Sequence, residues 1–195
     1  MTYNLQYIFK GEIDMSLHGI TKGTPLEKMA EMMALGEAKG TMMYYTLARL
    51  AKEQGLDDVA EQFIEAANQE AVHAGFYATV NGMLPKDFWQ LVRGLMSAET
   101  SGEKKVKAMA DKFREAGLAE AADEMEVFAK QEDHHGVVLA KILEKHCPGL
   151  LEAAGKKIYV CSVCGYEHVG DLDAEPDDFA CPLCGQPKKV FKLKN

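Results

Sequence analysis

Apolar and charged residues follow each other with helical spacing over most of the chain, from about residue 25 to residue 146. Glycine, asparagine and proline interrupt this pattern at a few points, where helices are expected to end. Thr24-Pro25 is typical of a helix start, Gly55 and Gly117 are typical of helix ends, and Pro85 is expected to open the third helix. The pattern predicts four long helices, at about residues 25–54, 57–81, 85–116 and 119–146.

The composition changes at about residue 157, where the helical pattern gives way to β-branched, aromatic, glycine and proline residues. This change predicts a small second domain built from strands and turns. The sequence therefore divides into an N-terminal extension (residues 1–24), a helical domain (25–147), a linker (148–157) and a C-terminal domain (158–195).

The helical part contains an internal repeat with an offset of 62 residues. This offset relates Glu37 to Glu99, Gly40 to Gly102, Gly55 to Gly117, Glu70 to Glu132 and His73 to His135. The repeat indicates a duplicated helical hairpin. Each copy carries one Glu on its first helix and a Glu-x-x-His motif on its second.

The repeated Glu and His residues have the spacing of a dinuclear metal site. Residues three apart project from one face of a helix, so the four helices would bring four carboxylates and two imidazoles to one interior point. This is the donor set of the di-iron or di-manganese site of ferritin-like four-helix bundles. The other interpretation is ordinary surface residues, but all three groups recur beside an apolar stripe, where carboxylates without a cation would be costly. The predicted ligands are Glu37, Glu70, His73, Glu99, Glu132 and His135.

The connection between the second and third predicted helices bears on assembly. In a ferritin-like bundle these helices are parallel, so the connection must run the length of the bundle. Helices of about 25 residues are about 37 Å long, which takes about ten extended residues to cross. Only residues 82–84 clearly lie between them. Either the third helix begins much later, or each hairpin pairs with one from another chain. We expect the second arrangement, a domain-swapped homodimer with ligands from both chains at each site.

Four cysteines in the C-terminal domain form two Cys-x-x-Cys motifs, Cys161 to Cys164 and Cys181 to Cys184. This spacing is typical of a tetrahedral all-sulfur site for zinc or iron. A glycine follows each motif and lets the backbone turn so that amide N–H groups point at the sulfurs. The spacing alone leaves zinc and iron open. Cys147 lies outside the motifs and is expected to be a bystander.

Charge and composition exclude some classes of function. The net charge of −8 and the absence of a basic stripe argue against a nucleic-acid partner. No apolar run approaches the about 20 residues that a membrane span needs, and the N-terminus lacks the features of a secretion signal. We therefore expect a cytoplasmic protein, whose cysteines serve metal ligation rather than disulfides.

The residues around the four cysteines resemble rubredoxin, a family that binds one iron in four cysteines and passes single electrons. The resemblance rests on Tyr159-Val160-Cys161, Cys164-Gly165-Tyr166, Gly170-Asp171, Pro176, Phe179, Cys181-Pro182, Cys184-Gly185, Lys188 and Phe191. Phe179 stands where rubredoxins usually carry Trp. Such a module after a duplicated ferritin-like bundle resembles the rubrerythrin family, over residues 25–195.

This resemblance implies a peroxidase of anaerobic or microaerophilic bacteria or archaea that reduces hydrogen peroxide to water. It implies a di-iron centre in each four-helix site and one iron in the four-cysteine site. Electrons would come from a separate NAD(P)H-dependent reductase or a rubredoxin. Glu70 and Glu132 would bridge the two metals, and Glu37 and Glu99 would each cap one. Tyr44 would donate a hydrogen bond to a carboxylate; a role as a core aromatic is equally open.

One position departs from the family pattern. Rubrerythrins usually carry an extra Glu three residues after the terminal Glu of the second repeat, and here that position is Gly102. Glu103 faces roughly the same side, but its lysine neighbours indicate a surface residue. Two alternatives stay open: an oxygen reductase or ferroxidase that uses the same di-iron site, and an iron-binding protein whose four-cysteine site holds zinc. The remaining histidines are expected at the surface: His18, His134, His146 and His168.

Overall fold

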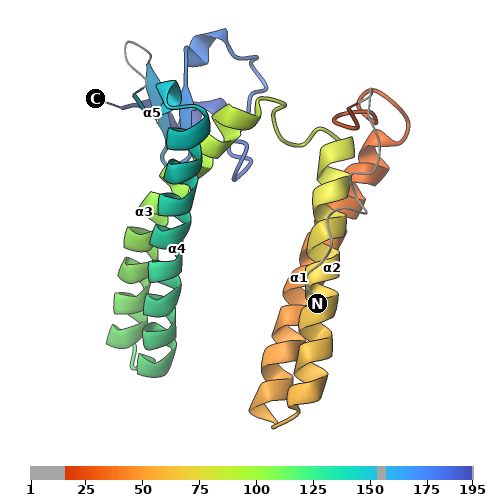
Figure 1. The fold of residues 1–195 in the computed structure, drawn as a ribbon, viewed down its shortest axis with the longest axis vertical. Helices are drawn as coiled ribbons and strands as arrows, with labels where there is room; N and C mark the ends of the chain where they lie inside the picture. The colour runs from red at the N-terminus through yellow and green to blue at the C-terminus, as the bar shows by residue number, and fades with distance from the viewer. Residues whose placement is uncertain (1–15, 153–156, 195) are drawn as a thin grey trace. The chain divides into compact units, whose positions relative to one another are not determined.

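The computed structural model describes residues 16–152 and 157–194. Its contacts divide the chain into two compact units, Met1–Lys86 and Asp87–Asn195. The first unit holds one helical hairpin, and the second holds another hairpin and a small sheet (Figure 1). The predicted fold class is confirmed: four long helices precede a small strand domain with a four-cysteine site. The predicted domain boundaries stay predictions, and most of the N-terminal extension lies outside the described residues.

The first unit is an antiparallel hairpin of α1 (Glu27–Glu53) and α2 (Asp57–Val80) (Figure 1). Small side chains fill the seam between the helices, because the buried residues are almost all alanine: Ala30, Ala34, Ala48, Ala51, Ala60 and Ala67. Larger side chains such as Met32, Met43 and Phe76 are exposed. Small residues let helix axes approach closely, so acidic side chains of α1 and α2 can meet across the seam.

The turns that close the two hairpins are copies of each other. Gly55 follows α1 with a φ of +72°, and the N–H of Leu56 donates to the carbonyl of Ala51 at 2.9 Å. Gly117 follows the third helix with a φ of +80°, and the N–H of Leu118 donates to the carbonyl of Phe113 at 2.9 Å. A glycine in the left-handed backbone conformation commonly ends a helix in this way. Both predicted helix ends are confirmed.

Two predicted helix starts were wrong by a few residues. The first helix begins at Glu27, because Thr24 accepts a hydrogen bond from the N–H of Leu26 at 3.1 Å within the preceding turn. The third helix, α3 (Phe88–Glu115), begins three residues after Pro85. Asp87 caps it and accepts a hydrogen bond from the N–H of Gln90 at 3.0 Å. The start of α3 is therefore set by the side-chain cap of Asp87, which satisfies a free backbone N–H, and not by Pro85.

The second unit begins with the antiparallel hairpin of α3 and α4 (Ala119–His146), followed by the short α5 (Gly149–Glu152). A three-stranded antiparallel sheet comes next, in the order β2 (Glu167–Val169), β1 (Ile158–Cys161), β3 (Phe191–Leu193). Tyr159 of β1 pairs with His168 of β2. Two short 3-10 turns, η2 (Leu172–Ala174) and η3 (Lys188–Val190), complete it. Four aromatic residues pack with the cysteines in its core: Tyr159, Tyr166, Phe179 and Phe191.

His168 is buried, so the prediction that it lies at the surface was wrong. Only 7% of the residue is exposed, and all three residues of β2 are buried because this strand packs against α3. The imidazole contacts the ring of Phe179, and its Nε2 lies 3.5 Å from Oε1 of Glu175. Burial lowers the pKa of His168. His134 and His146 are exposed, as predicted.

Candidate metal centres

The first acidic cluster lies on the hairpin of the first unit. Glu37 belongs to α1, and Glu70 and His73 belong to α2. Nδ1 of His73 is 3.7 Å from Oε2 of Glu37 and 3.9 Å from Oε2 of Glu70. The carboxylate side chains are mostly buried, 19% and 25% exposed, whereas the imidazole is 55% exposed. The hairpin therefore covers the carboxylates and leaves the cluster open on its imidazole side.

The second cluster repeats this arrangement in the second unit. Glu99 belongs to α3, and Glu132 and His135 belong to α4. Nδ1 of His135 lies 3.3 Å from Oε2 of Glu99, with the carboxylate 26% and the imidazole 56% exposed. In each cluster the three ligand atoms lie within 4.8 Å of one another. The six predicted ligands thus form two groups of three, one in each unit, and their binding of metal stays a prediction.

The electrostatics of both clusters suits a bound cation. A hydrogen bond with Glu37 raises the pKa of Glu70, because adjacent carboxyl groups hold a proton between them. In the second cluster, burial and a hydrogen bond with Glu99 raise the pKa of Glu132. A divalent cation would take the place of these protons. Mixed carboxylate and imidazole donors suit iron, so the residues present fit a di-iron centre.

A glycine lies against the carboxylate of each Glu-x-x-His motif. A Cβ at Gly102 would come within 2.8 Å of Oε2 and 3.3 Å of Cβ of Glu132. A Cβ at Gly40 would come within 3.3 Å of Oε2 of Glu70. The sequence showed that these glycines repeat, but not that they make room for the carboxylates. A Glu side chain at position 102 would displace Glu132 from the place it has here.

Tyr44 and Glu103, which the sequence also offered as site residues, contact side chains outside the two acidic clusters. Tyr44 packs against the ring of Phe63, with 6.2 Å between ring centroids, which is the aromatic role that the sequence left open. Its hydrogen bond to a carboxylate stays a prediction. The neighbouring Tyr45 donates to Oδ1 of Asn68 at 2.9 Å across the hairpin. Glu103 pairs with Lys107 one turn further along α3, as expected for a surface residue.

The four cysteines of the C-terminal sheet have the geometry of a tetrahedral metal site. The Sγ atoms of Cys161 and Cys184 lie 3.7 Å apart, and those of Cys164 and Cys181 lie 3.5 Å apart. A tetrahedron with metal–sulfur bonds of about 2.3 Å has edges of about 3.8 Å. A disulfide would need about 2.05 Å. The thiol separations therefore fit one metal ion, and Cys147 is not part of this group.

Backbone N–H groups point at these sulfurs, as the glycines after each motif predict. Gly165 and Gly185 have φ values of +86° and +68°, and their N–H groups close the turns onto the carbonyls of Cys161 and Cys181. Burial raises the pKa of Cys161, but backbone N–H donors from Val163 and Cys164 outweigh it, so that this pKa is lowered. Burial raises the pKa of Cys164 to about 11. Such hydrogen bonds stabilise added negative charge at a thiolate-bound iron and tune its potential.

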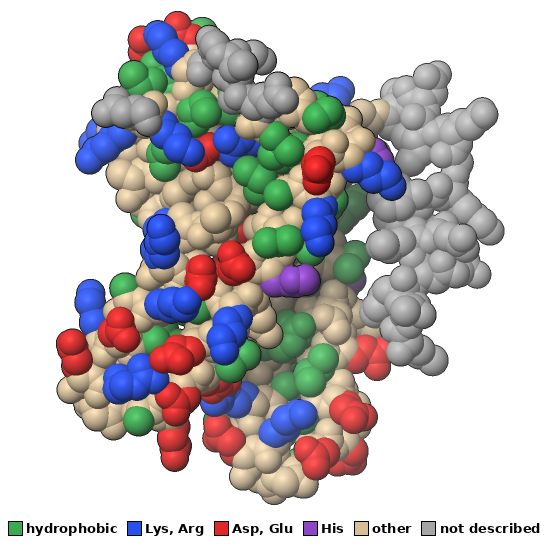
Figure 2. Space-filling view, turned by 60° about the vertical axis from the view of Figure 1, so that its left-hand side comes forward, with side chains coloured by type: hydrophobic (Ala, Val, Ile, Leu, Met, Phe, Trp, Pro, Cys, Tyr) green, Lys and Arg blue, Asp and Glu red, His purple; other side chains and the backbone are tan. Residues whose placement is uncertain are grey.

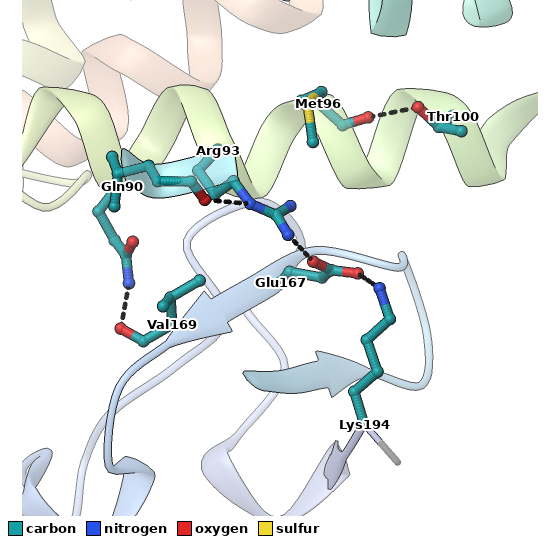
Figure 3. A network of polar contacts seen from close by, with 8 residues as sticks. Gln90, Arg93, Met96, Thr100, Glu167, Val169 and Lys194 are labelled. Atoms are coloured by element: carbon teal, nitrogen blue, oxygen red, sulfur yellow. Dashed lines mark hydrogen bonds and ion pairs between the residues drawn. The ribbon is translucent and has the colours of Figure 1, made fainter. Parts of the chain in front are cut away.

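The sheet is fixed to α3 by a polar network that the sequence did not predict (Figure 3). Nη2 of Arg93 lies 2.7 Å from Oε2 of Glu167, and Nζ of Lys194 donates to Oε1 of Glu167 at 2.6 Å. Nε2 of Gln90 donates to the carbonyl of Val169 at 2.7 Å. The Arg93 and Glu167 side chains are only 7% and 5% exposed. No local spacing signals this network, because its members are distant in the sequence.

Glu167 is ionised within this network. Burial raises the pKa of Glu167, but hydrogen bonds from Lys194 and Ser97 and the charge of Arg93 outweigh it, so the pKa lies below its ordinary value. Beside the network, the ring of Tyr166 lies on the backbone of Gly94. We call this set of five residues the α3 latch: Arg93, Gly94, Tyr166, Glu167 and Lys194.

Comparisons with known families agree with both metal sites. The family model described as "Rubrerythrin" matches residues 30–87, and the one described as "Rubrerythrin, rubredoxin-like domain" matches residues 159–192. The chain belongs to the rubrerythrin family. As a rubrerythrin-family protein it is an oxidoreductase, with sites for a di-iron centre and for one iron in four cysteines.

Several curated relatives cover most of the chain. An uncharacterized protein of Methanocaldococcus jannaschii is 34% identical over 128 residues, which are 66% of this chain and 91% of that protein. A putative rubrerythrin of the same organism is 27% identical and spans 82% of this chain and 88% of its own length. A rubrerythrin of Porphyromonas gingivalis is 26% identical, over 88% of this chain and 90% of its own. Among the residues that the structure describes, no helix is long and apolar enough to cross a membrane.

Proposed function

We propose that this protein is a peroxidase that reduces hydrogen peroxide to water at its di-iron centre, with electrons relayed through the four-cysteine iron. The observation that carries the proposal is the presence, in one chain, of two Glu–Glu–His clusters and one four-thiol cluster. Reduction of peroxide takes two electrons and two protons. A pair of ferrous ions supplies both electrons together, which avoids the one-electron step that releases hydroxyl radical, and hard carboxylate ligands favour their oxidation.

The carboxylates of the two clusters would have two different roles in binding the di-iron centre. Glu70 and Glu132 would bridge the metals, and Glu37 and Glu99 would each cap one. His73 and His135 are the most exposed members of their clusters, at 55% and 56%. The open imidazole side of each cluster is where the other three ligands would complete a dinuclear site.

The length of the connection between the hairpins supports a domain-swapped homodimer. Residues 81–87 connect α2 to α3. Fully extended, this connection spans less than about 30 Å, because each residue covers at most about 3.5 Å. With 24 residues, α2 is about 36 Å long at about 1.5 Å per residue. Parallel packing of α2 and α3 in one bundle is therefore out of reach. Each hairpin would instead complete its site with a hairpin of a second chain.

Exposed apolar side chains support the same assembly. Met32, Met43 and Phe76 are exposed on the first hairpin, and Val127 and Phe128 are exposed on α4. Apolar side chains are visible between the charged ones on the molecular surface (Figure 2). Burial of such residues against a second chain would contribute the usual hydrophobic stabilisation of an obligate dimer.

The proposed partners follow from the same chemistry. A separate NAD(P)H-dependent reductase or a rubredoxin would supply electrons to the four-cysteine iron, in the cytoplasm. Neither a nucleic acid nor a membrane is part of the proposed function.

A di-iron oxygen reductase or ferroxidase is the second candidate. Gly102 favours this second candidate. With glycine at position 102, the two clusters have the same composition, and the site lacks the extra Glu that rubrerythrins usually carry. The third candidate is an iron-binding protein whose four-cysteine site holds structural zinc. Metal analysis with a visible spectrum tests this candidate, since ferric thiolate is red and zinc thiolate is colourless.

The experiment that separates the first two starts from anaerobically reduced, iron-loaded protein. We would mix it in a stopped-flow instrument with hydrogen peroxide or with oxygen and follow the return of the red ferric–thiolate colour. The peroxidase proposal expects rapid return with peroxide and a response at least tenfold slower with oxygen. The opposite order would refute it. The matched control is the Glu132→Ala variant, in which the four-cysteine iron should stay ferrous and the red colour should not return on the same timescale.

A further inference from the structure

We infer that a cleft between α3 and the sheet binds inorganic phosphate. The cleft has a volume of about 320 Å³, which is at the lower end of the range for small-molecule sites. All the residues that line it belong to the second unit. Phosphate binding here is separate from the proposed reduction of peroxide, because none of the described lining residues is a proposed metal ligand.

Cations outnumber carboxylates in this cleft. Arg93, Lys104 and Lys194 line it. Glu167 is the one acid among the described lining residues. The cleft therefore has an excess of two positive charges, although the chain as a whole has a net charge of −8. A local excess of this kind attracts anions. Phosphate, which carries between one and two negative charges near neutral pH, would neutralise most of it.

An almost completely buried ion pair holds two of these cations in place. The side chains of Arg93 and Glu167 are only 7% and 5% exposed, and Nη2 of Arg93 lies 2.7 Å from Oε2 of Glu167. Nζ of Lys194 donates to the other carboxylate oxygen at 2.6 Å (Figure 3). Because each oxygen of Glu167 already contacts a cation, the carboxylate positions both cations for a ligand. An ammonium group can donate three hydrogen bonds, so Lys194 can bind Glu167 and an anion together.

Lys104 supplies a positive charge that no acid on its own helix neutralises. An ion pair within a helix needs an acid three or four positions away. The positions at this spacing carry two hydroxyl residues, a lysine and an alanine: Thr100, Ser101, Lys107 and Ala108. By contrast, Lys107 pairs with Glu103. Among the described residues, the exposed ammonium of Lys104 has no hydrogen-bond or ion-pair partner, so its N–H groups can all bind a ligand.

The hydroxyl groups of the cleft favour phosphate over other anions of similar charge. Thr100 and Ser101 each donate a hydrogen bond of 2.8 Å to a carbonyl of the preceding turn of α3. The hydroxyl of Ser97 donates to Glu167. These oxygens therefore offer their lone pairs to a ligand. Inorganic phosphate retains a proton near neutral pH and can donate it to such an oxygen, whereas sulfate retains none.

The first copy of the internal repeat lacks these basic residues. The offset of 62 residues relates Arg93 to Glu31 and Lys104 to Met42, whereas the Glu and His residues of the acidic clusters recur at the same offset. The cleft is therefore not a by-product of the duplicated hairpin. It belongs to the copy whose first helix carries the sheet.

Bound phosphate would connect α3 to the sheet. Lys104 belongs to α3, and Lys194 directly follows β3, so an anion between their ammonium groups contacts both elements. A ligand that binds only the packed arrangement stabilises that arrangement by mass action. Phosphate would therefore add one more contact to those of the α3 latch.

The first test locates the anion. We would expose the iron-loaded protein to trace reductive methylation, which keeps the charge of the amine, and measure the methylation rate of each lysine by mass spectrometry. Inorganic phosphate should slow the methylation of Lys104 and leave the rate of Lys107, one turn further along α3, unchanged. Sodium chloride and sodium sulfate at the same ionic strength are the controls. Equal slowing at Lys107, or equal protection of Lys104 by sulfate, would indicate an adventitious ion only and would overturn the proposal.

The second test measures affinity by equilibrium dialysis of the iron-loaded protein against radiolabelled phosphate. Lys104→Met should weaken binding about tenfold, the usual effect of losing a hydrogen bond from a charged group. Lys107→Met is the matched control and should bind as the wild type does. Phosphate that binds to ferric iron is retained by both variants, so the difference between them reports the cleft. Equal affinity of the two variants would refute phosphate binding at this place, whatever the protein does with peroxide.

Discussion

The ring of Tyr166 lies so close to the backbone of Gly94 that a Cβ on that glycine would come within 2.0 Å of Cε2. Tyr166 is 1% exposed and belongs to the core of the cysteine domain, so it cannot move aside without disturbing the residues around the metal site. This single contact joins the packing of the small domain to the surface of α3.

Gly94→Ala should therefore destabilise the second unit. Overpacking of a close contact typically costs about 1–3 kcal/mol. Urea unfolding of the iron-loaded protein, followed by loss of the red colour and by circular dichroism, would measure the change. Gly75→Ala is the control and should change the unfolding free energy much less, because its methyl group meets nothing within 4 Å. Equal effects of the two substitutions would argue against the contact.

Glu167 should make the stability of the docked domain depend on pH. Its pKa is lowered in the folded protein, so its contribution is fully present above the ordinary glutamate pKa and is lost as the pH falls through the lowered value. The wild type should therefore lose more stability than Glu167→Gln between about pH 6 and pH 3. Near pH 7 the substitution should cost about 3 kcal/mol, as expected when a buried ion pair loses one partner. Denaturant titrations of both proteins across this range would test the sign.

Glu70→Ala and Glu132→Ala should each abolish peroxide turnover and leave the four-cysteine iron red. Each substitution removes the proposed bridging carboxylate of one cluster, while the thiol cluster is untouched. Steady-state assays with a reductase and NADH, alongside visible spectra, would check this. Glu144→Ala on α4, an exposed residue outside both clusters, is the matched control and should turn over normally. Turnover that survives in both cluster variants would place peroxide reduction elsewhere in the protein.

Mixtures of inactive variants should test the domain-swapped dimer. In a swapped dimer, chains with Glu70→Ala mixed with chains with Glu132→Ala should recover activity. About a quarter of the wild-type rate is expected, because half of the dimers are mixed and each of these has one complete site out of two. In a dimer without swapping, both clusters of a site come from one chain, so the same mixture should recover none.

The sequence predicted the parts of this protein that depend on local spacing. Helix ends at Gly55 and Gly117 follow from what glycine does after a helix, and the cysteine knuckles follow from two Cys-x-x-Cys motifs. The two clusters were predictable because a duplication repeats the same spacing, which a lone Glu and His would not have revealed. The third helix start differed because Asp87 offers a side-chain cap that Pro85 lacks.

Features that depend on tertiary contact were not predictable in this way. Arg93 and Glu167 meet only because β2 packs on α3, and neither residue stands in a recognisable motif. The burial of His168 has the same origin, since a three-residue strand has too few positions to show which faces are covered. The close approach of Gly102 to Glu132 likewise depends on how tightly α3 and α4 pack.

The hydrogen bond from Lys194 to Glu167 has a practical consequence for work with this protein. Lys194 and Arg93 are the two cations on Glu167, so acylation of the Lys194 amine by a labelling reagent would remove one of them. A labelled sample would keep its colour and all its cysteine ligands, but its C-terminal domain would be held less firmly on α3. Intact mass should therefore be measured for every preparation before kinetic results from different batches are compared.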